Sequence, residues 1–382
     1  MRVLICRSNP IAPDPRVEKT ARTLCQAGYE VLVLGWDRTA SLPKQEERDG
    51  FTVKRLRIRA RFGSGLGNLP QLMRWQIGLV IWLIRHRHAY DLIHACDFDT
   101  VLPALLMKFL WRKTVIYDIF DFYADHLRKT PGWIKQIIRK VDLWVIGRAD
   151  AVILADEARR AQILGASPRE VEIVYNSPED VNLTPDKILG ADRKVLHLAY
   201  VGLLQAERGL FELLDVLEKH TDWHLDLAGF GGDEQAILER IREMSNVTWH
   251  GRVDYHRALT LSAAADVLLA TYDPSIPNHR YSSPNKVFEA MMLGKPIIVA
   301  RGTNMDNIIT QADCGLVVDY GSVPALEQAL CTLVGDPQLR LRLGQNGRRV
   351  YEQKFAWKIM ADRLLSLYER VIFRSAMKRG GR

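Results

Sequence analysis

Residues 282–298, SSPNKVFEAMMLGKPII, are the most informative stretch of this chain. They predict a polar loop, a short amphipathic helix over Asn285–Leu293, a stop at Gly294 and an apolar strand. The first turn of a helix has unpaired N–H groups and a partial positive charge, which favour a phosphate, and Lys286 adds a full charge there. Glu289 follows one turn later, where a carboxylate can accept hydrogen bonds from a ribose diol. The segment therefore suits a nucleotide diphosphate, against the competing interpretation of a connecting helix with a surface Lys–Glu pair.

The bulk composition is that of a soluble globular protein. With 382 residues, 47% of them hydrophobic and 26% charged, the chain is long enough for two domains that each bury a core. The start, MRVLIC, predicts a short strand and not a secretory signal, and no apolar run reaches the roughly 18 residues of a membrane span. The five cysteines are scattered without a CxxC pair, which argues against disulfides and zinc. We therefore expect a cytoplasmic protein.

The net charge of +8 is concentrated in the first half of the chain. Residues 1–180 contain 28 Lys and Arg against 21 Asp and Glu, and the stretch 51–90 contains eight basic residues and no acidic one. A one-sided charge of this kind indicates that the first half faces something anionic.

Apolar runs alternate with helical patterns along the whole chain, which predicts two parallel α/β sheets covered on both faces. We expect an N-terminal domain over 1–178, a polar linker over 179–194, a second domain over 195–355 and a final helix and basic tail over 356–382. Two such Rossmann-like domains would face a cleft. In sheets of this kind, ligands bind at the carboxyl ends of the strands, so the loops that follow the strands are the candidate sites.

Two glycine loops in the second domain follow predicted strands. In the first, Gly202 permits a close backbone approach and Arg208 can contact phosphate oxygens with two parallel hydrogen bonds. The second, around Gly229, has only part of the spacing of a dinucleotide fingerprint and predicts a tight turn beside the same pocket. A surface arginine next to a turn is the competing interpretation of Arg208.

In the first domain, polar residues also follow strands. Asp97 and Asp99 spell a DxD motif, for which we favour capping of the following helix over metal binding. Asp118, Asp121 and His126 follow the next strand, and Asp121 or His126 could orient or deprotonate an acceptor hydroxyl. Capping and plain exposure are the alternatives.

The loop after the first strand carries three predictions. Asp14 is a suitable N-cap, Pro15 a suitable first helical residue, and Arg16 in the first turn could contact an anionic acceptor or pair with a neighbouring acid.

Two predicted helices, over 71–87 and 132–147, combine tryptophan and aliphatic residues with basic residues near their ends. This pattern suits a helix lying on an anionic lipid surface, and the alternative is a sheet-covering helix with a solvated basic face. Together with the acid-free basic stretch, it favours peripheral contact with an anionic membrane. We expect no nucleic-acid partner.

The motifs in their order along the chain resemble the GT-B glycosyltransferases, and among them the large retaining family 4. The first domain contributes DPRVEKTARTLCQAGYEVLVLGWDR, DLIHACDFD and VIYDIFDFYADH, and VYNSPED resembles the family's linker. The second contributes YVGLLQAERGL, LDLAGFGG, SSPNKVFEAMMLGKPIIVA and the closing GQNGRRVYEQKFAWKIMADRLLSLYERV. The likeness covers nearly the whole chain, and it implies a last helix that crosses back to the first domain.

The resemblance implies transfer of a sugar from a nucleotide-diphosphate sugar to an acceptor hydroxyl, with retention of configuration and without a bound metal or other cofactor. It implies that Glu289 holds the ribose, that Arg208 binds the diphosphate and that the helix start from Ser283 through Asn285 to Lys286 receives the phosphates. The donor-binding residues are then Gly202, Arg208, Gly229, Ser283, Asn285, Lys286 and Glu289. The acceptor would be a glycan or a lipid-linked glycan contacted by Arg16, Asp118, Asp121 and His126.

Three positions depart from the family pattern. Tyr281 stands where many members have the first glutamate of E-x7-E, Leu203 where they have arginine, and Phe120 where they have histidine. The last departure makes Asp121, with Arg208 and Lys286, the expected catalytic group.

The leading hypothesis is thus a glycosyltransferase of surface polysaccharide or glycolipid assembly, placed at the inner face of the cell membrane. A sugar-nucleotide epimerase of the same fold and a non-catalytic binding module for nucleotide sugars or lipids are the alternatives.

Overall fold

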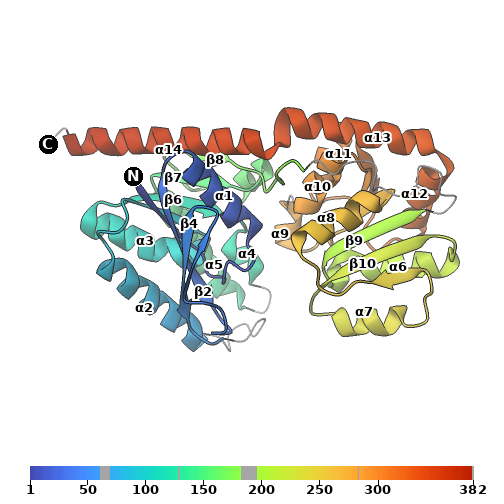
Figure 1. Ribbon diagram of the computed structural model, residues 1–382, viewed down its shortest axis with the longest axis horizontal. Coiled ribbons are helices and arrows are strands. Elements are labelled where there is room, and N and C mark those ends of the chain that lie inside the picture. The colour runs from blue at the N-terminus through green and yellow to red at the C-terminus, as the bar shows by residue number, and fades with distance from the viewer. Residues whose placement is uncertain (61–68, 128–129, 182–195, 283, 381–382) are drawn as a thin grey trace. The chain divides into compact units, whose positions relative to one another are not determined.

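Strands that are apolar along their whole length, and not on one face alone, need cover on both sides of the sheet, and the computed structural model provides it (Figure 1). The structure describes residues 1–60, 69–127, 130–181, 196–282 and 284–380, without the side chains of His126 and of residues 378–380. The chain divides into two units, Met1–Tyr175 with Met360–Arg382, and Asn176–Ile359. Most of the linker predicted over 179–194, and Ser283, lie outside the described residues.

The first unit is an eight-stranded sheet in the order β3-β4-β2-β1-β5-β6-β7-β8. Its strands are β1 Arg2–Cys6, β2 Glu30–Asp37, β3 Gln45–Arg48, β4 Phe51–Arg57, β5 Leu92–Cys96, β6 Thr114–Ile119, β7 Ala151–Leu154 and β8 Val171–Ile173. Its helices are α1 Pro15–Gln26, α2 Leu69–Arg85, α3 Phe98–Trp111, α4 Tyr123–His126, α5 Gly132–Ile146, the 3-10 turn η2 Glu157–Ala161 and, from Met360 onward, α14 Trp357–Gly380.

The two faces of this sheet are covered by different helices. Ile93 and Ala95 of β5 point into a core that contains Trp75 and Leu79 of α2 and residues of α3 and α5. His94, between them, points to the other face, where its ring stacks at 6.1 Å on Tyr368 of α14. The last helix therefore completes the first unit, as predicted.

The second unit is a six-stranded parallel sheet in the order β11-β10-β9-β12-β13-β14, the 3-2-1-4-5-6 order of a dinucleotide-binding fold. Its strands are β9 His197–Leu203, β10 His224–Phe230, β11 Val247–Trp249, β12 Val267–Ala270, β13 Ile297–Ala300 and β14 Gly315–Val318. Its helices are η4 Ala206–Arg208, α6 Leu210–Lys219, α7 Glu234–Ile241, α8 Tyr255–Ala264, α9 Pro277–Arg280, α10 Asn285–Leu293, α11 Met305–Ala312, α12 Val323–Gly335, α13 Pro337–Val350 and the π-helical turn η5 Tyr351–Phe355. The prediction of two Rossmann-like domains is confirmed.

Capping residues in the sequence mark where several helices begin or end. Asp14 caps α1, because its side chain accepts a hydrogen bond from the N–H of Val17 at 3.2 Å, and Pro15 is the first helical residue. Gly294 ends α10 in the left-handed conformation at φ 63°, and the N–H of Lys295 bonds the carbonyl of Ala290 at 2.9 Å.

One prediction about the sheets is wrong. The first sheet is not wholly parallel, since β3 pairs antiparallel with β4; its sequence QEER is too polar to signal a strand, but an edge strand needs only one partner. After β7, residues Glu157–Ala161 form a 3-10 turn of five residues.

Among the described residues, every helix is too short or too polar to cross a bilayer.

Candidate functional site

The carboxyl ends of β9, β10 and β12 lie side by side at the point where the strand order of the second sheet reverses. Gly202 and Gly229 are register partners at the ends of β9 and β10. A Cβ atom on Gly229 would lie 1.8 Å from the carbonyl oxygen of Gly202, so this close approach admits no side chain. Both predicted glycine loops thus border one edge of the sheet.

Lys286 occupies the first turn of α10, beside this edge. Its ammonium nitrogen lies 3.1 Å from the centroid of the Tyr200 ring, and a Cβ atom on Gly202 would lie 2.9 Å from its Cε. This nitrogen is buried and has no hydrogen-bond partner among the described residues. Burial and the nearby charge of Arg208 hold the pKa of Lys286 well below its ordinary value, and Glu289 opposes them. The nitrogen of Lys286 thus lies on an aromatic face, and no described residue accepts a hydrogen bond from it.

Arg208 ends the 3-10 turn that follows β9. Its guanidinium carbon lies 3.8 Å from the ring centroid of Tyr272, just after β12. Its Nε is buried, and no described residue accepts a hydrogen bond from it. The next residue, Gly209, has φ 68°, and a Cβ atom there would lie 2.3 Å from the hydroxyl of Thr271. Arg208 is therefore held against Tyr272, and its Nε–H remains available to donate a hydrogen bond to a ligand.

The start of α10 adds backbone donors to the two cations. Pro284 is the N-cap; its side chain makes no capping bond, and its carbonyl accepts a hydrogen bond from the N–H of Val287 at 3.0 Å. The side-chain oxygen of Asn285 is buried and unbonded within the described part of the chain. Lys286 and Arg208 lie close enough that the charge of Arg208 lowers the pKa of Lys286, and Asn285 precedes Lys286 in the same helical turn; their binding of a donor stays a prediction.

Glu289 lies one turn further along α10. Tyr255, the first residue of α8, hydrogen-bonds this carboxylate, and burial together with the charge of Glu289 raises the pKa of Tyr255. The three tyrosines Tyr200, Tyr255 and Tyr272 were missed by sequence reasoning. Their position relative to strand ends was the available signal for Tyr200 and Tyr272, whereas nothing in the sequence pairs Tyr255 with Glu289.

In the first unit, Arg16 and Asp118 are bound to each other. The guanidinium Nη2 of Arg16 lies 2.8 Å from Oδ1 of Asp118 and its Nε 3.2 Å from Oδ2, and each side chain is only 3% exposed. His94 contacts the same carboxylate at 3.2 Å and the hydroxyl of Tyr368 at 2.8 Å. Although burial favours protonation, Arg16 and His94 hold the pKa of Asp118 below its ordinary value. These bonds give the pair an internal role, and its predicted contact with an acceptor stays a prediction.

Asp121 is placed differently, because its side chain is 51% exposed. One carboxylate oxygen accepts a hydrogen bond from Nη2 of Arg159 at 2.7 Å, a partner that the sequence did not suggest. Phe120, the preceding residue, has two guanidinium groups close to its ring, that of Arg7 at 4.1 Å and that of Arg16 at 4.8 Å from the ring centroid. The side chain of His126 lies outside the description.

The predicted capping role of the DxD motif is wrong. Asp97 is at the N-cap of α3, but its side chain makes no cap bond. Its Oδ1 accepts instead from the N–H of Phe120 at 2.9 Å, and Oδ2 pairs with Arg7. Burial raises the pKa of Asp97 to about 6, against the opposing charge of Arg7. The carboxylate thus ties the ends of β5 and β6 to the loop after β1.

One group of described residues could offer metal ligands, namely His94, Cys96 and Asp118, whose ligand atoms lie within 4.8 Å of one another. They do not suit a cation. Burial raises the pKa of the Cys96 thiol well above its ordinary value, and Asp118 already binds Arg16 on both oxygens.

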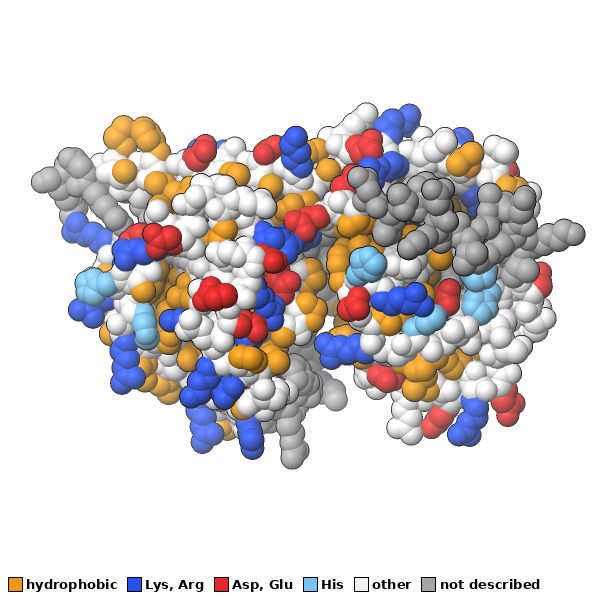
Figure 2. Space-filling model, in the orientation of Figure 1, with side chains coloured by type: hydrophobic (Ala, Val, Ile, Leu, Met, Phe, Trp, Pro, Cys, Tyr) orange, Lys and Arg blue, Asp and Glu red, His pale blue; other side chains and the backbone are white. Residues whose placement is uncertain are grey.

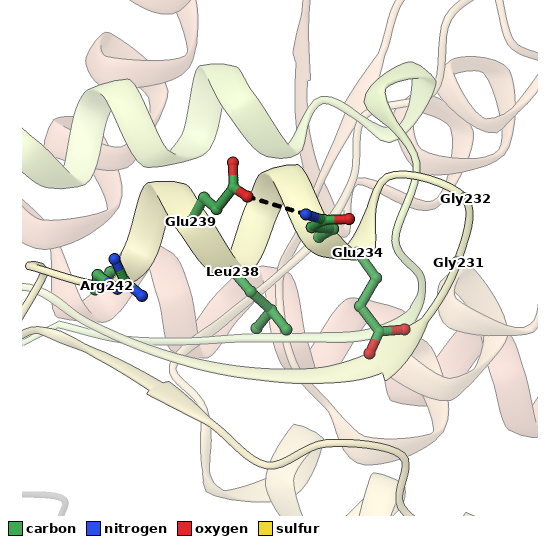
Figure 3. Close-up of a pocket in the computed structure, with 7 residues that line it drawn as sticks. Gly231, Gly232, Glu234, Leu238, Glu239 and Arg242 are labelled. Carbon is green, nitrogen blue, oxygen red and sulfur yellow. Dashed lines mark hydrogen bonds between the residues drawn. The ribbon is translucent and has the colours of Figure 1, made fainter.

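A surface pocket lies elsewhere in the second unit, along α7 (Figure 3). It is lined by Gly231, Gly232, Glu234, Gln235, Leu238, Glu239 and Arg242. The amide of Gln235 bonds the carboxylate of Glu239 at 3.1 Å along its rim. Neither Lys286 nor Arg208 contributes to it, so the candidate site is defined by its unsatisfied polar groups and not by this hollow.

Two family models match the chain. The model described as "Glycosyl transferase 4-like domain" covers residues 12–177, and the model "Glycosyl transferases group 1" covers residues 184–350. Each corresponds to most of one unit, and together they span nearly the whole chain.

Individual proteins agree with the models. The D-inositol 3-phosphate glycosyltransferase of Corynebacterium glutamicum is 24% identical over 380 residues, which is 92% of this chain and 90% of that protein. Sucrose-phosphate synthase from Thermosynechococcus elongatus has a TM-score of 0.79 at 16% identity, covering 98% of this chain and 100% of the other. HepE from Anabaena, in complex with UDP, has a TM-score of 0.71 at 16% identity over 97% of this chain and 100% of its own. The chain is thus a glycosyltransferase with the GT-B fold and belongs to the glycosyl transferases group 1 family.

Proposed function

We propose that this enzyme transfers a sugar from a nucleotide-diphosphate sugar to an acceptor hydroxyl, with retention of configuration, in the assembly of a surface polysaccharide or a glycolipid. The observation that carries the donor assignment is the buried ammonium of Lys286, which has no hydrogen-bond acceptor among the described residues. A buried charge without a partner is costly, and a diphosphate would supply the missing negative oxygens. HepE, with the same fold, is described in complex with UDP, which supports the same class of ligand.

The roles follow from charge and position. Arg208 and Lys286 bind the diphosphate and stabilise the charge that grows on it as the sugar departs, so the positive groups act where the transition state needs them and no metal ion is required. Asn285 and the N–H groups at the start of α10 complete the phosphate contacts. Glu289, oriented by Tyr255, holds the ribose hydroxyls. Gly202 and Gly229 leave room at the strand ends.

In the first unit, Asp121 is the residue that we assign to the acceptor hydroxyl. Its carboxylate is half exposed and held by Arg159 through one oxygen, so the other oxygen can accept a bond from substrate. We propose a glycan or lipid-linked acceptor and a place of action on the cytoplasmic side of an anionic membrane, as a peripheral protein.

The test has a binding arm and a transfer arm. Thermal unfolding is followed with UDP, GDP, ADP and their sugars, because a ligand that binds only the folded protein raises its melting temperature. Arg208→Ala and Glu289→Ala should each lower transfer at least about tenfold, since each removes a charged contact with the donor. Arg242→Ala, which removes an arginine of the α7 pocket in the same unit, is the matched control and should leave transfer unchanged.

Three outcomes would contradict the proposal. Wild-type rates in both variants would show that Arg208 and Glu289 do not bind the donor. Epimerisation or hydrolysis of the donor without any acceptor would indicate an epimerase. Tight donor binding with every activity unaffected by Asp121→Ala would indicate a binding module.

A further inference from the structure

The outer side of three neighbouring helices in the first unit is strongly apolar. α3 contacts both α2 and α5, and the inner residues of all three, such as Leu79, Met107 and Val145, belong to one core beneath them. Their outer residues therefore form one continuous surface, which we call the three-helix surface. In Figure 2, hydrophobic and basic side chains lie beside one another over the region that α2 and α3 occupy in Figure 1.

Each helix contributes a stripe. α2 exposes Leu69, Met73, Ile77 and Ile81, each four residues from the last. α3 exposes Leu102 and Leu106 and ends with Phe109, Leu110 and Trp111, and α5 exposes Trp133, Ile137 and Trp144. The side chain of Phe109 is 84% exposed. Large apolar side chains gathered in this way mark an interaction surface, whereas single exposed ones do not.

The charges on these helices have one sign. All their residues are described, and the only acidic ones are Asp142, which is buried, and Asp99, which is mostly buried. Basic residues lie among the apolar ones, for example Arg74 on α2 and Lys135 and Lys140 on α5. Such a surface attracts an anionic partner, because it carries no exposed acidic side chain that would repel one.

Two of the exposed tryptophans carry an arginine on their ring. The guanidinium of Arg87 lies 5.8 Å from the ring centroid of Trp111, and that of Arg148 lies 5.1 Å from that of Trp144. Tryptophan prefers the boundary between lipid tails and headgroups, and arginine beside it can bind a headgroup phosphate. The combination favours a lipid surface over a protein partner.

We infer that the three-helix surface is the part of this protein that lies on an anionic bilayer, with the end of α3 from Phe109 to Trp111 entering furthest. Its apolar stripes lie among the acyl chains and its basic residues among the headgroups. This deepens the membrane proposal above by naming the contact, and it adds α3, which the sequence did not single out. It does not depend on sugar transfer.

The experiment measures binding of the full chain to vesicles by flotation, without donor or acceptor. Vesicles of phosphatidylcholine with about one third phosphatidylglycerol are compared with phosphatidylcholine alone. We expect at least about tenfold tighter binding to the anionic vesicles, reduced by salt, because several basic side chains act together and are screened within about 10 Å at 0.1 M salt.

Surface variants locate the contact. Phe109→Ser should weaken binding at least about fivefold, because it removes one buried apolar side chain from the lipid. Phe373→Ser is the matched control, since Phe373 is 63% exposed on α14 and lies outside the three-helix surface. Arg74→Glu with Lys140→Glu should weaken binding to anionic vesicles at least about tenfold, and Lys358→Glu, which reverses an exposed charge at the start of α14, should not.

Several outcomes would overturn the inference. They are equal binding to both kinds of vesicle, equal loss in Phe109→Ser and Phe373→Ser, and a dimer in gel filtration that Phe109→Ser converts to a monomer while vesicle binding is absent. Donor-dependent thermal shifts measured on the same variants separate this result from a failure of the sugar-transfer proposal, because a lipid contact leaves donor binding intact.

Discussion

The ammonium of Lys286 lies 3.1 Å above the ring of Tyr200, close enough to Gly202 that a methyl group there would collide with the lysine side chain. A cation on an aromatic face is stabilised by about 0.5–2 kcal/mol, which is less than its loss of water costs. In the free enzyme the protonated form of Lys286 is therefore disfavoured, and an anion beside it would stabilise that form.

Lys286→Met should lower sugar transfer at least about tenfold and leave the free enzyme as stable as before or more so, because an unpaired buried charge is replaced by an apolar chain of similar length. Transfer rates and unfolding without donor are measured together. Lys295→Met is the control, since Lys295 has a lowered pKa through burial but lies beyond the other end of α10. Loss of stability by several kcal/mol in Lys286→Met would contradict the assignment.

Binding of UDP or GDP should take up a proton at Lys286. The pKa of this lysine is lowered in the free enzyme, and phosphate oxygens would return it toward the ordinary value of about 10.4. Between the lowered pKa and the ordinary one, the free side chain is mostly neutral, so affinity should fall as the pH rises through this window. Folding without ligand has the opposite pH dependence: its stability rises with pH in this window, because the unfolded chain binds a proton that the folded free enzyme does not. Calorimetry in two buffers with different ionisation enthalpies measures the uptake, and Lys286→Arg should abolish it.

Gly229→Ala should destabilise the second unit by at least about 2 kcal/mol, because the new Cβ atom would meet the carbonyl of Gly202 at 1.8 Å and the backbone has to shift. Gly232→Ala, three residues on, is the control, because a Cβ atom there meets nothing within 4 Å. Urea unfolding of both variants compares them. Equal stability would show that the two strand ends are further apart than described.

Substitution of Asp118 in β6 should affect mainly stability, whereas substitution of Asp121 in the loop after it should affect mainly activity. Asp118→Asn breaks a buried pair with Arg16 and should cost about 3 kcal/mol of stability. Asp121→Asn keeps an oxygen that can accept a hydrogen bond from the buried guanidinium of Arg159, so it should cost at most about 1 kcal/mol of stability while lowering turnover. Unfolding curves measure the change in stability of each variant, and turnover at saturating donor measures the change in activity. Unchanged turnover in Asp121→Asn would remove it from the acceptor site.

Tyr255→Phe should raise the KM for the donor about threefold to tenfold with little change in kcat, since it removes the hydrogen bond that orients Glu289. In a double-mutant cycle with Glu289→Ala, the two effects should not add, because the tyrosine acts through the carboxylate. Additive losses would mean that Tyr255 contacts substrate by itself.

Much of the fold could be predicted because it depends on repeated local signals. Apolar runs gave the parallel strands, and Asp14, Pro15 and Gly294 gave helix ends. The strand β3 could not be predicted, because a polar edge strand has no alternating or continuous apolar pattern.

The candidate site could be predicted where local signals mark it, since Arg208 follows a strand end and Lys286 lies in the first turn of a helix, and not where distant segments meet. Tyr255 on Glu289, Arg159 on Asp121 and Asp97 on the backbone of Phe120 are tertiary contacts, and single-residue patterns do not encode them. The outward apolar stripe of α3 could not be predicted for a related reason. The helix is apolar nearly all round, so its sequence does not show which side faces the core.

The return of α14 to the first unit has a consequence for how the protein is made. Leu364, Leu367 and Tyr368 are fully or almost fully buried against a sheet whose last strand ends at Ile173. After the last strand of the N-terminal sheet, the ribosome must therefore synthesise about half of the chain before α14 is available to cover that sheet. During that interval the nascent first unit exposes an uncovered apolar face to the chaperones of the cell, while the second unit has all of its own sequence and can complete its fold first.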